Sequence, residues 1–298
     1  MISILIPFYN ESYSLLELSK QLQRVLAGEK EKYELIFVDD GSTDGSAERL
    51  QSLKTTYHLI RHRKRFGKGK ALIDGFNAST GEIILFLDAD LQDDPVDIPR
   101  FLERIRAGLD FVNGWRINRQ DPLSKRLPSA IFNRILLKPF LHSRFHDINC
   151  GFKAMRRCVL EEIPLYGDNY RFLPILAHEN GFRVGEIKVI HHFRQYGKSK
   201  YGLLRLFFGL FDTMTTYFIY RFSERPLHFF GMIGSIFFSI GSLIALNLGY
   251  QRIFAGRLLY RRPILLLAIL LIIVGVQIIM TGIIAELLVY ISQKNKKV

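Results

Sequence analysis

Short apolar runs alternate with helical spacings of apolar side chains along the first two thirds of the chain. Runs of strand length cover residues 2–6, 33–38, 57–60, 82–87, 111–115 and 183–193. Helical spacing covers residues 11–27, 42–53, 70–78, 96–107, 127–141 and 168–180. Continuous apolar runs are typical of parallel strands that are buried on both faces. The alternation therefore predicts an α/β domain with a Rossmann-like, mostly parallel sheet.

The last third of the chain has a different pattern, because long apolar runs replace the charged positions from about Leu227 onward. The segments 227–248 and 264–291 are long enough to span a bilayer. Residues 201–222 are also very apolar, but interrupting charges make them typical of a helix in the membrane interface. We therefore expect three regions, which are a catalytic domain at 1–200, an interface helix at 201–225 and a transmembrane hairpin with a basic tail at 226–298.

The number of spans decides which side of the membrane the arginine-rich loop 249–263 faces. Two spans after a cytoplasmic first domain place this loop outside, against the positive-inside rule. A third span at 203–222 would return the loop to the cytoplasm, but it would bring Arg205 and Asp212 near the middle of the bilayer at a high cost. We favour two spans for this reason.

Small residues in the first span indicate close helix packing. Ser235 with Ser239 and Gly241 with Ala245 are each four residues apart, a spacing that lets helices approach closely. The neighbour could be the second helix of the hairpin or another copy of the chain, so a homo-oligomer is one of the expected arrangements. Such spacings also occur without any packing role.

The net charge of +13 indicates an anionic partner. Basic clusters at 116–138 and 194–225 lie towards the membrane segments, where they suit anionic lipid headgroups. The sequence has no zinc finger, RNA-recognition signature or basic zipper, so no nucleic-acid partner is expected. Two cysteines and an N-terminus without a secretory signal favour a reducing compartment. We expect a multi-pass protein of the plasma (inner) membrane with a cytoplasmic catalytic domain.

The motif Asp88-Ala89-Asp90 follows the buried strand at 82–87. Alternate positions of an extended backbone project to one side, so both carboxylates can share a ligand. Mg²⁺ and Mn²⁺ favour carboxylate and phosphate oxygens, and Gln92 could add another oxygen. Ligands of open α/β sheets bind outside the carboxyl ends of the strands, so a site for a metal-bound diphosphate is expected here. A solvated acidic turn is the alternative.

Three further segments follow strands or precede a helix, and each could instead be an ordinary turn. Asp39-Asp40-Gly41-Ser42 ends the strand at 33–38, and its carboxylates can accept hydrogen bonds from a base or ribose. Pro7-Phe8-Tyr9-Asn10-Glu11 offers an aromatic ring for stacking on a base. The glycine- and lysine-rich segment 65–71 could face an anion at a helix start, although it lacks the spacing of a P-loop.

Other kinds of site find little support. An EF-hand is excluded because the loop from Asp88 has neither glycine at its sixth position nor glutamate at its twelfth. The histidine pairs at 58/62 and 142/146 lack a third zinc ligand at a suitable spacing. No G-x-S-x-G segment supplies a nucleophilic serine.

Taken together, the motifs resemble those of family 2 glycosyltransferases with the GT-A fold. The first set is Pro7-Phe8-Tyr9-Asn10-Glu11, Asp39-Asp40-Gly41-Ser42 and Asp88-Ala89-Asp90-Leu91-Gln92-Asp93. The second set is Gly114-Trp115-Arg116, Asn149-Cys150-Gly151-Phe152-Lys153 and the segment 194–201. The second set is similar to the polyprenyl-phosphate branch, which includes dolichyl-phosphate mannose synthase and the bacterial undecaprenyl-phosphate glucose and aminoarabinose transferases. The resemblance covers essentially the whole chain, including a two-helix anchor.

The resemblance implies roles for individual residues. Those that would bind the nucleotide-sugar are Pro7, Tyr9, Glu11, Val38, Asp39, Asp40, Asp88, Ala89 and Asp90. A divalent metal, Mg²⁺ or Mn²⁺, would be held by Asp88, Asp90 and Gln92. The phosphates of donor and acceptor would lie near Arg116, Lys125, Arg126, Arg194 and Lys200. The transfer itself would depend on Asp88, Asp90, Arg116, Arg194 and Lys200.

The implied reaction is an inverting transfer of one sugar from a nucleotide-sugar to a polyprenyl phosphate at the cytoplasmic membrane face. UDP-glucose is the preferred donor, because the two-span anchor resembles the bacterial glucose branch, while GDP-mannose, UDP-N-acetylglucosamine and modified pentoses stay open. A processive polysaccharide synthase would carry a Q-x-x-R-W motif, but no arginine precedes Trp115, the single tryptophan. A non-catalytic scaffold that kept the fold is the other alternative, and its acidic motifs would be eroded.

Overall fold

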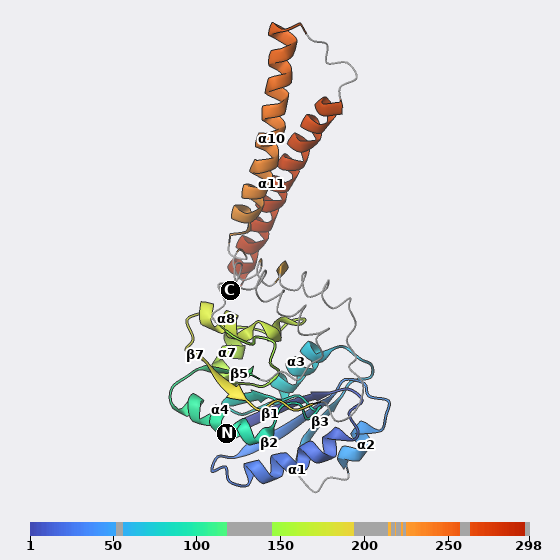
Figure 1. Ribbon diagram of the computed structural model, residues 1–298, viewed down its shortest axis with the longest axis vertical. Coiled ribbons are helices and arrows are strands. Elements are labelled where there is room, and N and C mark those ends of the chain that lie inside the picture. Colours follow the sequence, from blue (N-terminus) through green and yellow to red (C-terminus); the bar gives the residue numbers. More distant parts are fainter. Residues whose placement is uncertain are drawn as a thin grey trace. The chain divides into compact units, whose positions relative to one another are not determined.

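The computed structural model describes residues 1–51, 56–117, 145–193, 225–256 and 263–295, with the single positions 214, 215, 218 and 222 (Figure 1). The chain forms two compact units, Met1–Thr213 and Met214–Val298. The helices that the sequence predicts at 127–141 and 201–222 lie outside the described residues, apart from those single positions.

The first unit is built on a seven-stranded sheet with the order β3-β2-β1-β4-β6-β5-β7. Every pairing is parallel except those of β6, which runs against β4 and β5. The strands are β1 (Ile2–Phe8), β2 (Tyr33–Asp39), β3 (His58–Arg61), β4 (Ile83–Phe86), β5 (Phe111–Arg116), β6 (Lys153–Arg156) and β7 (Val184–Val189). The predicted α/β architecture is therefore confirmed, with one antiparallel strand added.

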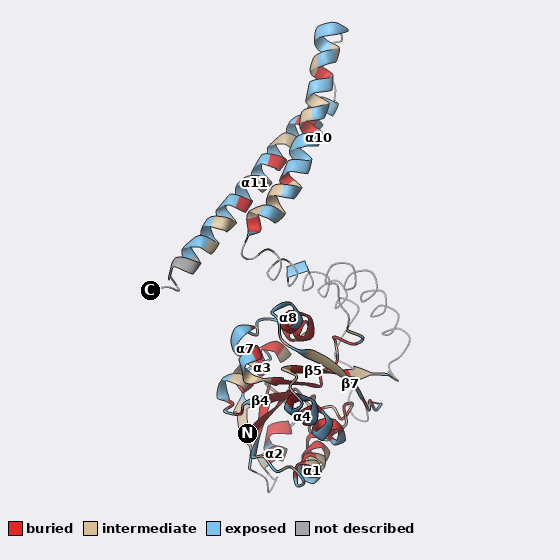
Figure 2. Ribbon diagram, turned by 90° about the vertical axis from the view of Figure 1, so that its left-hand side faces the viewer, coloured by how far each residue is buried: buried red, intermediate tan, exposed pale blue. Residues whose placement is uncertain are grey.

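Helices cover both faces of the sheet. Figures 1 and 2 show α3, α7 and α8 over one face and α1, α2 and α4 over the other. The helical elements are α1 (Ser14–Leu26), α2 (Ser46–Gln51), α3 (Lys68–Ala78), η1 (Pro95–Asp97), α4 (Ile98–Arg106), α7 (Arg157–Glu162), η3 (Asn169–Arg171) and α8 (Leu173–Glu179). The sandwich buries the central strands on both faces, which explains why their sequences are almost continuously apolar.

Three elements differ from the sequence-based prediction. The helix expected at 42–53 begins only at Ser46, because Asp44 accepts hydrogen bonds from the backbone N–H and hydroxyl of Ser46 and so forms a turn there. The prediction omitted β6 and α7. β6 has only four residues and contains a buried lysine, so it carries no apolar run.

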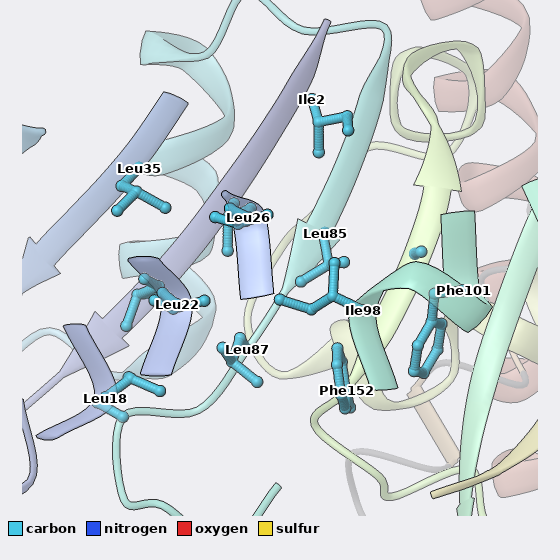
Figure 3. Packing of buried hydrophobic residues seen from close by; sticks show 14 of the residues in the cluster. Ile2, Leu18, Leu22, Leu26, Leu35, Leu85, Leu87, Ile98, Phe101 and Phe152 are labelled. Carbon is cyan, nitrogen blue, oxygen red and sulfur yellow. The ribbon is translucent and has the colours of Figure 1, made fainter. Parts of the chain in front are cut away.

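The main hydrophobic core lies between the sheet and the helices α1 and α4 (Figure 3). α1 and α4 present apolar side chains three or four residues apart, which places them on one helix face. These side chains are Leu15, Leu18, Leu22, Leu26, Ile98, Phe101, Leu102 and Ile105. Phe101 packs on Phe152, just before β6, with ring centroids 4.3 Å apart. This packing ties the antiparallel strand to the parallel part of the sheet.

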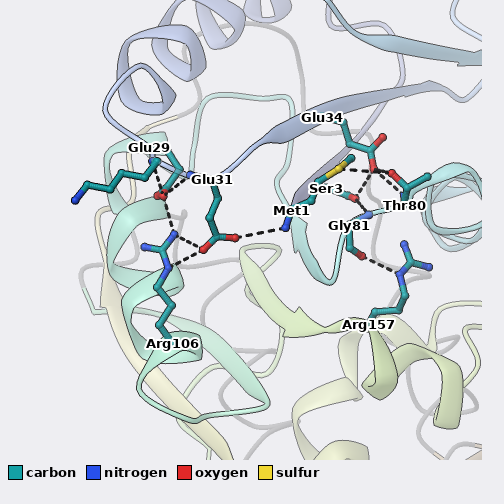
Figure 4. Close-up of polar contacts among 10 residues, drawn as sticks. Met1, Ser3, Glu29, Glu31, Glu34, Thr80, Gly81, Arg106 and Arg157 are labelled. Carbon is teal, nitrogen blue, oxygen red and sulfur yellow. Dashed lines mark hydrogen bonds and ion pairs between the residues drawn. The ribbon is translucent and has the colours of Figure 1, made fainter.

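Polar contacts secure the amino-terminal edge of the sheet (Figure 4). The buried Ser3 hydroxyl donates to Glu34 Oε1 at 2.6 Å and accepts a bond from the backbone N–H of Gly81 at 2.8 Å. Arg157 Nε donates to the Gly81 carbonyl at 2.8 Å, and Arg106 pairs with Glu31 at 2.8 Å. These contacts join β1, β2, α4 and α7 at this edge.

The second unit contains two long apolar helices, α10 (Pro226–Phe254) and α11 (Pro263–Asn295). Both are long and apolar enough to cross a membrane, as predicted from the sequence. They pack closely through small residues seven positions apart. A Cβ added at Gly234 would lie 2.7 Å from the Gly275 carbonyl oxygen, and one at Gly241 would lie 2.8 Å from the Ala268 carbonyl oxygen. Only glycine allows this approach of the two backbones.

The packing face differs from the small-residue spacing that the sequence suggested. Ser235 and Ser239 are exposed, whereas Gly241 packs within the hairpin. Glu286 on α11 accepts a hydrogen bond from the backbone N–H of Leu227 at 3.1 Å. This carboxylate satisfies one of the donors that the first turn of α10 leaves without an intrahelical partner.

The first unit buries one lysine completely. Lys153, the first residue of β6, is 0% exposed, and its ammonium donates to Asn113 Oδ1 at 2.6 Å and to the Ile148 carbonyl at 3.0 Å. Burial lowers the pKa of Lys153 from 10.5 to about 8, while Cys150 and Asp147 act in the opposite direction. Lys153 thereby joins β5 to the residues just before β6 at an electrostatic cost.

This cost predicts a pH dependence of stability. Between pH 8 and 10.5 the unfolded chain holds a proton on Lys153 that the folded chain has lost, so stability from this group rises with pH across that window. Relative to Lys153→Met, the free energy of unfolding of the wild type should increase by up to roughly 3 kcal/mol over that range. Urea unfolding followed by the fluorescence of Trp115 measures it. A difference between the two proteins that stays constant with pH would contradict the assignment.

Candidate active site

The expected motifs meet at the carboxyl edge of the sheet. β1 and β2 are paired up to Phe8 with Asp39, so both strands end at the same level. β4 leaves its pairing with β1 after Leu5 with Phe86, and Asp88 follows two residues later. Because β6 is antiparallel, it begins at this same edge with Lys153. Open α/β sheets bind their ligands here.

Pro7 and Val38 are paired across β1 and β2, and both are buried. Pro7 cannot donate a backbone hydrogen bond, and it lies beyond the point where β4 has left its pairing with β1. At Pro7 and Phe8, β1 is therefore paired with β2 alone.

Asp39 presents a buried acceptor at this edge of the sheet. The residue is 0% exposed, and its Oδ1 accepts a hydrogen bond from the backbone N–H of Ser42 at 2.7 Å. Its Oδ2 lies 3.4 Å from Arg61 Nε as an ion pair, but it accepts no hydrogen bond from the described residues. Buried polar atoms are normally hydrogen-bonded. A ligand hydroxyl or amide would complete the bonding of Asp39.

Tyr9 and Glu11 line the same end of β1. The guanidinium of Arg65 lies 4.5 Å from the centroid of the Tyr9 ring, so that ring is flanked by a cation. Glu11 accepts a hydrogen bond from the Ser14 hydroxyl at 3.0 Å. Asn10, between them, has a φ of 54° and donates its backbone N–H to the Ser42 hydroxyl at 2.9 Å. The turn after β1 is thus fixed on the turn after β2.

Asp40 is engaged by the chain itself. Its carboxylate accepts hydrogen bonds from the backbone N–H groups of Phe66 and Gly67, each at 2.8 Å, and lies 3.0 Å from His62 Nδ1. Gly41, with a φ of 78°, packs so closely on Lys64 that a Cβ would lie 2.6 Å from its carbonyl carbon. Asp40 therefore holds the loop 62–67 over the strand ends, and its expected contact with substrate stays a prediction.

The segment after β4 alternates in burial. Ala89, Leu91 and Asp93 are buried, whereas Asp88, Asp90 and Gln92 are partly exposed, as the two-residue period predicts. Leu91 adopts a φ of 60°, which turns the chain tightly. Asp90 Oδ1 accepts a hydrogen bond from the backbone N–H of Gln92 at 3.3 Å. The side-chain nitrogen of Gln92 lies 3.5 Å from His191 Nε2.

Asp88 has two close neighbours. Its Oδ1 forms an ion pair with the ammonium of Lys68, at the start of α3. Its Oδ2 lies where a Cβ on Gly151 would be only 2.4 Å away. Gly151 therefore has to be glycine for Asp88 to take this position. The segment before β6 and the motif after β4 are parts of one site.

Arg116, at the end of β5, is partly buried, and one carboxylate binds it through two hydrogen bonds. Its Nε donates to Asp147 Oδ2 at 2.7 Å, and its Nη2 donates to Asp147 Oδ1 at 3.0 Å. Burial opposes its charge, but the carboxylates of Asp147 and Asp93 raise the pKa of Arg116 above its usual value. Burial also raises the pKa of Cys150, so this residue stays a thiol and is unsuited to act as a nucleophile.

The residues at this edge fit a divalent metal that shares its coordination with a substrate. The described part of the chain contains no cluster of three His, Cys, Asp or Glu side chains suited to a metal. Mg²⁺ commonly takes one or two carboxylates and completes its octahedron with phosphate oxygens and water. Asp88 already binds a cation, and its side chain is 33% exposed. Asp88 and Asp90 are thus suited to a metal that arrives with a diphosphate.

Some expected site residues cannot be compared with the structure, and others were missed. Those outside the described residues are Lys125, Arg126, Arg194 and Lys200. The sequence-based prediction assigned no role to Asp147, the partner of Arg116, and left Lys68 within a basic segment of uncertain use. An acidic residue just before Asn149-Cys150-Gly151 was the available signal for Asp147.

Comparison with known proteins identifies relatives along most of the chain. The model of glycosyl transferase family 2 matches residues 3–164. Dodecaprenyl-phosphate galacturonate synthase of Rhizobium johnstonii is 33% identical over 295 residues, which cover 96% of this chain and 87% of that protein. Undecaprenyl-phosphate 4-deoxy-4-formamido-L-arabinose transferase of Photorhabdus laumondii is 35% identical over 293 residues, with the same coverage of 96% and 87%.

Solved structures share the fold. Glucosyl-3-phosphoglycerate synthase of Mycobacterium tuberculosis, in complex with Mg²⁺ and uridine diphosphate, is similar with a TM-score of 0.57 and 19% identity, over 73% of this chain and 79% of that chain. Its complex with Mn²⁺ and UDP-glucose gives a TM-score of 0.56 and 18% identity, with 73% and 78% covered. The GT-A fold expected from the sequence is confirmed. With a family model that covers more than half of its length, the chain belongs to glycosyltransferase family 2 and is a sugar-transferring enzyme.

Proposed function

We propose that this enzyme transfers one sugar from a nucleotide-sugar to a polyprenyl phosphate at the cytoplasmic face of the plasma (inner) membrane, as a multi-pass protein. The observation that carries the proposal is the combination of the carboxylate pair Asp88 and Asp90 at the strand ends with two apolar helices of membrane-spanning length. Two relatives that match nearly the whole chain are named for sugar transfer to dodecaprenyl or undecaprenyl phosphate. A lipid acceptor explains why the enzyme has membrane helices at all.

The proposed reaction does not require a general base from the protein. A phosphate oxygen of the acceptor is anionic near neutral pH, so it can form the new bond to the anomeric carbon without a general base. The bond from that carbon to the diphosphate breaks, and its electron pair leaves with the nucleoside diphosphate. Attack opposite the leaving group inverts the anomeric centre. Cationic groups that stabilise the charge growing on the diphosphate therefore govern the rate.

The residues divide into three groups. Pro7, Tyr9, Glu11, Val38 and Asp39 bind the nucleoside, with the Oδ2 atom of Asp39 accepting a hydrogen bond from it. Asp88 and Asp90 hold Mg²⁺ or Mn²⁺, with Gln92 as a further ligand once its side chain turns away from His191. When bound, the metal supplies Lewis-acid stabilisation of the leaving diphosphate. Those assigned to the phosphates are Arg116, Lys125, Arg126, Arg194 and Lys200.

Arg116 is suited to its role by its pairing with Asp147. Two hydrogen bonds to one carboxylate fix the plane of the guanidinium and leave further N–H donors on its outer edge. A phosphate can bind those donors without moving the side chain. Preorganised donors cost no reorganisation during the reaction, which is what a stabiliser of developing charge requires.

A transfer assay tests the donor and the acceptor together. Membranes that contain the enzyme are incubated with undecaprenyl phosphate and with a panel of labelled nucleotide-sugars. The panel contains UDP-glucose, the preferred donor, with GDP-mannose, UDP-N-acetylglucosamine and the UDP forms of galacturonate and formamido-arabinose. We expect one donor to give labelled lipid whose sugar is released by mild acid. Absence of labelled lipid with every donor would favour a non-catalytic scaffold.

The carboxylate pair makes a second prediction. Asp90→Asn should fold normally and lower the transfer rate by roughly 10²- to 10³-fold, because one ligand of the charge-stabilising metal is lost. Asp94→Asn is the matched control, since Asp94 lies in the same loop but pairs with His192 at 3.0 Å. Rates are measured with the identified donor at saturating Mn²⁺. An Asp90→Asn enzyme with substantial activity would rule out the metal assignment.

The membrane topology can be tested at the turn between the two helices. With two spans, a cysteine at Ala255 in a Cys158→Ser background should react with an impermeant maleimide only from outside the cell. The control is the wild-type protein, which keeps Cys158. This cysteine is exposed on the first unit and should be labelled only after the membrane is opened. If the cysteine at position 255 is labelled only from the cytoplasm, the two-span arrangement is wrong and a third span is required.

A further inference from the structure

Lys68 binds the carboxylate that the proposed metal site needs. Its ammonium pairs with Asp88 Oδ1, and both side chains are partly exposed, at 19% for Lys68 and 33% for Asp88. An ammonium and a divalent cation cannot both bind this oxygen closely, because their charges repel each other. The structure thus contains a cation that competes with the metal for Asp88.

The backbone of Lys68 is held in place on both sides. Asp40 accepts hydrogen bonds from the N–H groups of Phe66 and Gly67, each at 2.8 Å. Gly69 packs against Gly167 so tightly that an added Cβ would lie 1.7 Å from the Gly167 carbonyl oxygen. A change in the position of the ammonium therefore requires only rotation of the side chain.

A second contact is available to the displaced ammonium. The Nζ atom of Lys68 already lies 5.1 Å from the centroid of the Tyr170 ring, which is buried to 6% exposure. A cation over an aromatic ring is stabilised without a carboxylate. The side chain can leave Asp88 and keep this partner.

We propose that Lys68 and the divalent metal exclude each other at Asp88, so that the metal enters together with the nucleotide diphosphate and not before it. This inference rests on the proposed function. Without nucleotide, the site has two carboxylates, one of which is already neutralised by Lys68. A diphosphate adds negative charge that binds the metal and also attracts the released ammonium. Lys68 is therefore a positioning residue that weakens the binding of free cations to Asp88 while no nucleotide is bound.

The test measures binding of Mn²⁺ alone, from the free Mn²⁺ signal in electron paramagnetic resonance. Lys68→Met in the full-length protein should bind Mn²⁺ about five- to tenfold more tightly than the wild type in the absence of nucleotide, which corresponds to the loss of one partly exposed ion pair. Lys68→Arg keeps the competing charge and should stay within about twofold of the wild type. Merely structural roles for Lys68 would not make metal binding tighter.

Lys70→Met is the matched control. It removes the same charge from the same helix, but Lys70 pairs with Asp74 at 2.6 Å, away from the carboxylate pair. Its Mn²⁺ affinity should equal that of the wild type. If Lys68→Met and Lys70→Met increase the affinity equally, the effect comes from general charge and the proposal is wrong. An unchanged or weaker affinity in Lys68→Met also overturns it.

A last comparison separates this inference from the proposed function. In the presence of UDP, Asp88→Asn should abolish Mn²⁺ binding, because that variant lacks the metal ligand itself. If Asp88→Asn abolishes binding but Lys68→Met changes nothing, the metal site is right and only the competition is wrong. If Asp88→Asn binds Mn²⁺ with UDP as well as the wild type does, the proposed metal site fails as a whole.

Discussion

The first unit gathers several carboxylates at one edge of its sheet, and most of the site's local structure compensates for that charge. Like charges so close together would destabilise the fold unless each had a partner. The pairs are Asp39 with Arg61, Asp40 with N–H groups of the loop 62–67, Asp88 with Lys68 and Asp147 with Arg116. The partners come from the ends of β3 and β5, the loop 62–67 and the start of α3, so compensation also fixes these segments relative to one another.

The parallel sheet and the position of the acidic motifs could be predicted because they follow from periodicity. Runs such as residues 2–6 and 82–87 are almost continuously apolar, a composition typical of strands that are buried on both faces. Strand ends then locate Asp39 and Asp88 at one edge by topology alone. The two membrane-length helices could also be predicted from the sequence, because length and hydropathy are enough to identify such segments.

Features that depend on contacts between distant segments could not be predicted from sequence patterns. β6 has no apolar run, since it begins with Lys153, whose burial depends on Asn113 from another strand. Asp40 looks like a second substrate ligand beside Asp39, yet its oxygens are used by backbone groups more than twenty residues away. Gly151 belongs to a motif that the sequence identifies, but only the closeness of Asp88 in the structure explains why a glycine is needed there.

Compensation also bears on the proposed reaction, in which an edge that is stable when empty binds a metal with a diphosphate. Partners such as Arg61 and Lys68 are long cations with exposed side-chain surface, so they can be replaced at modest cost, whereas a largely buried pair cannot lose one member cheaply. Arg116 with Asp147 is the largely buried pair. In the proposed reaction the exchangeable cations give way to ligands, while Arg116 keeps the orientation that Asp147 fixes. A transfer that needs charge stabilisation but no general base would use both kinds of cation.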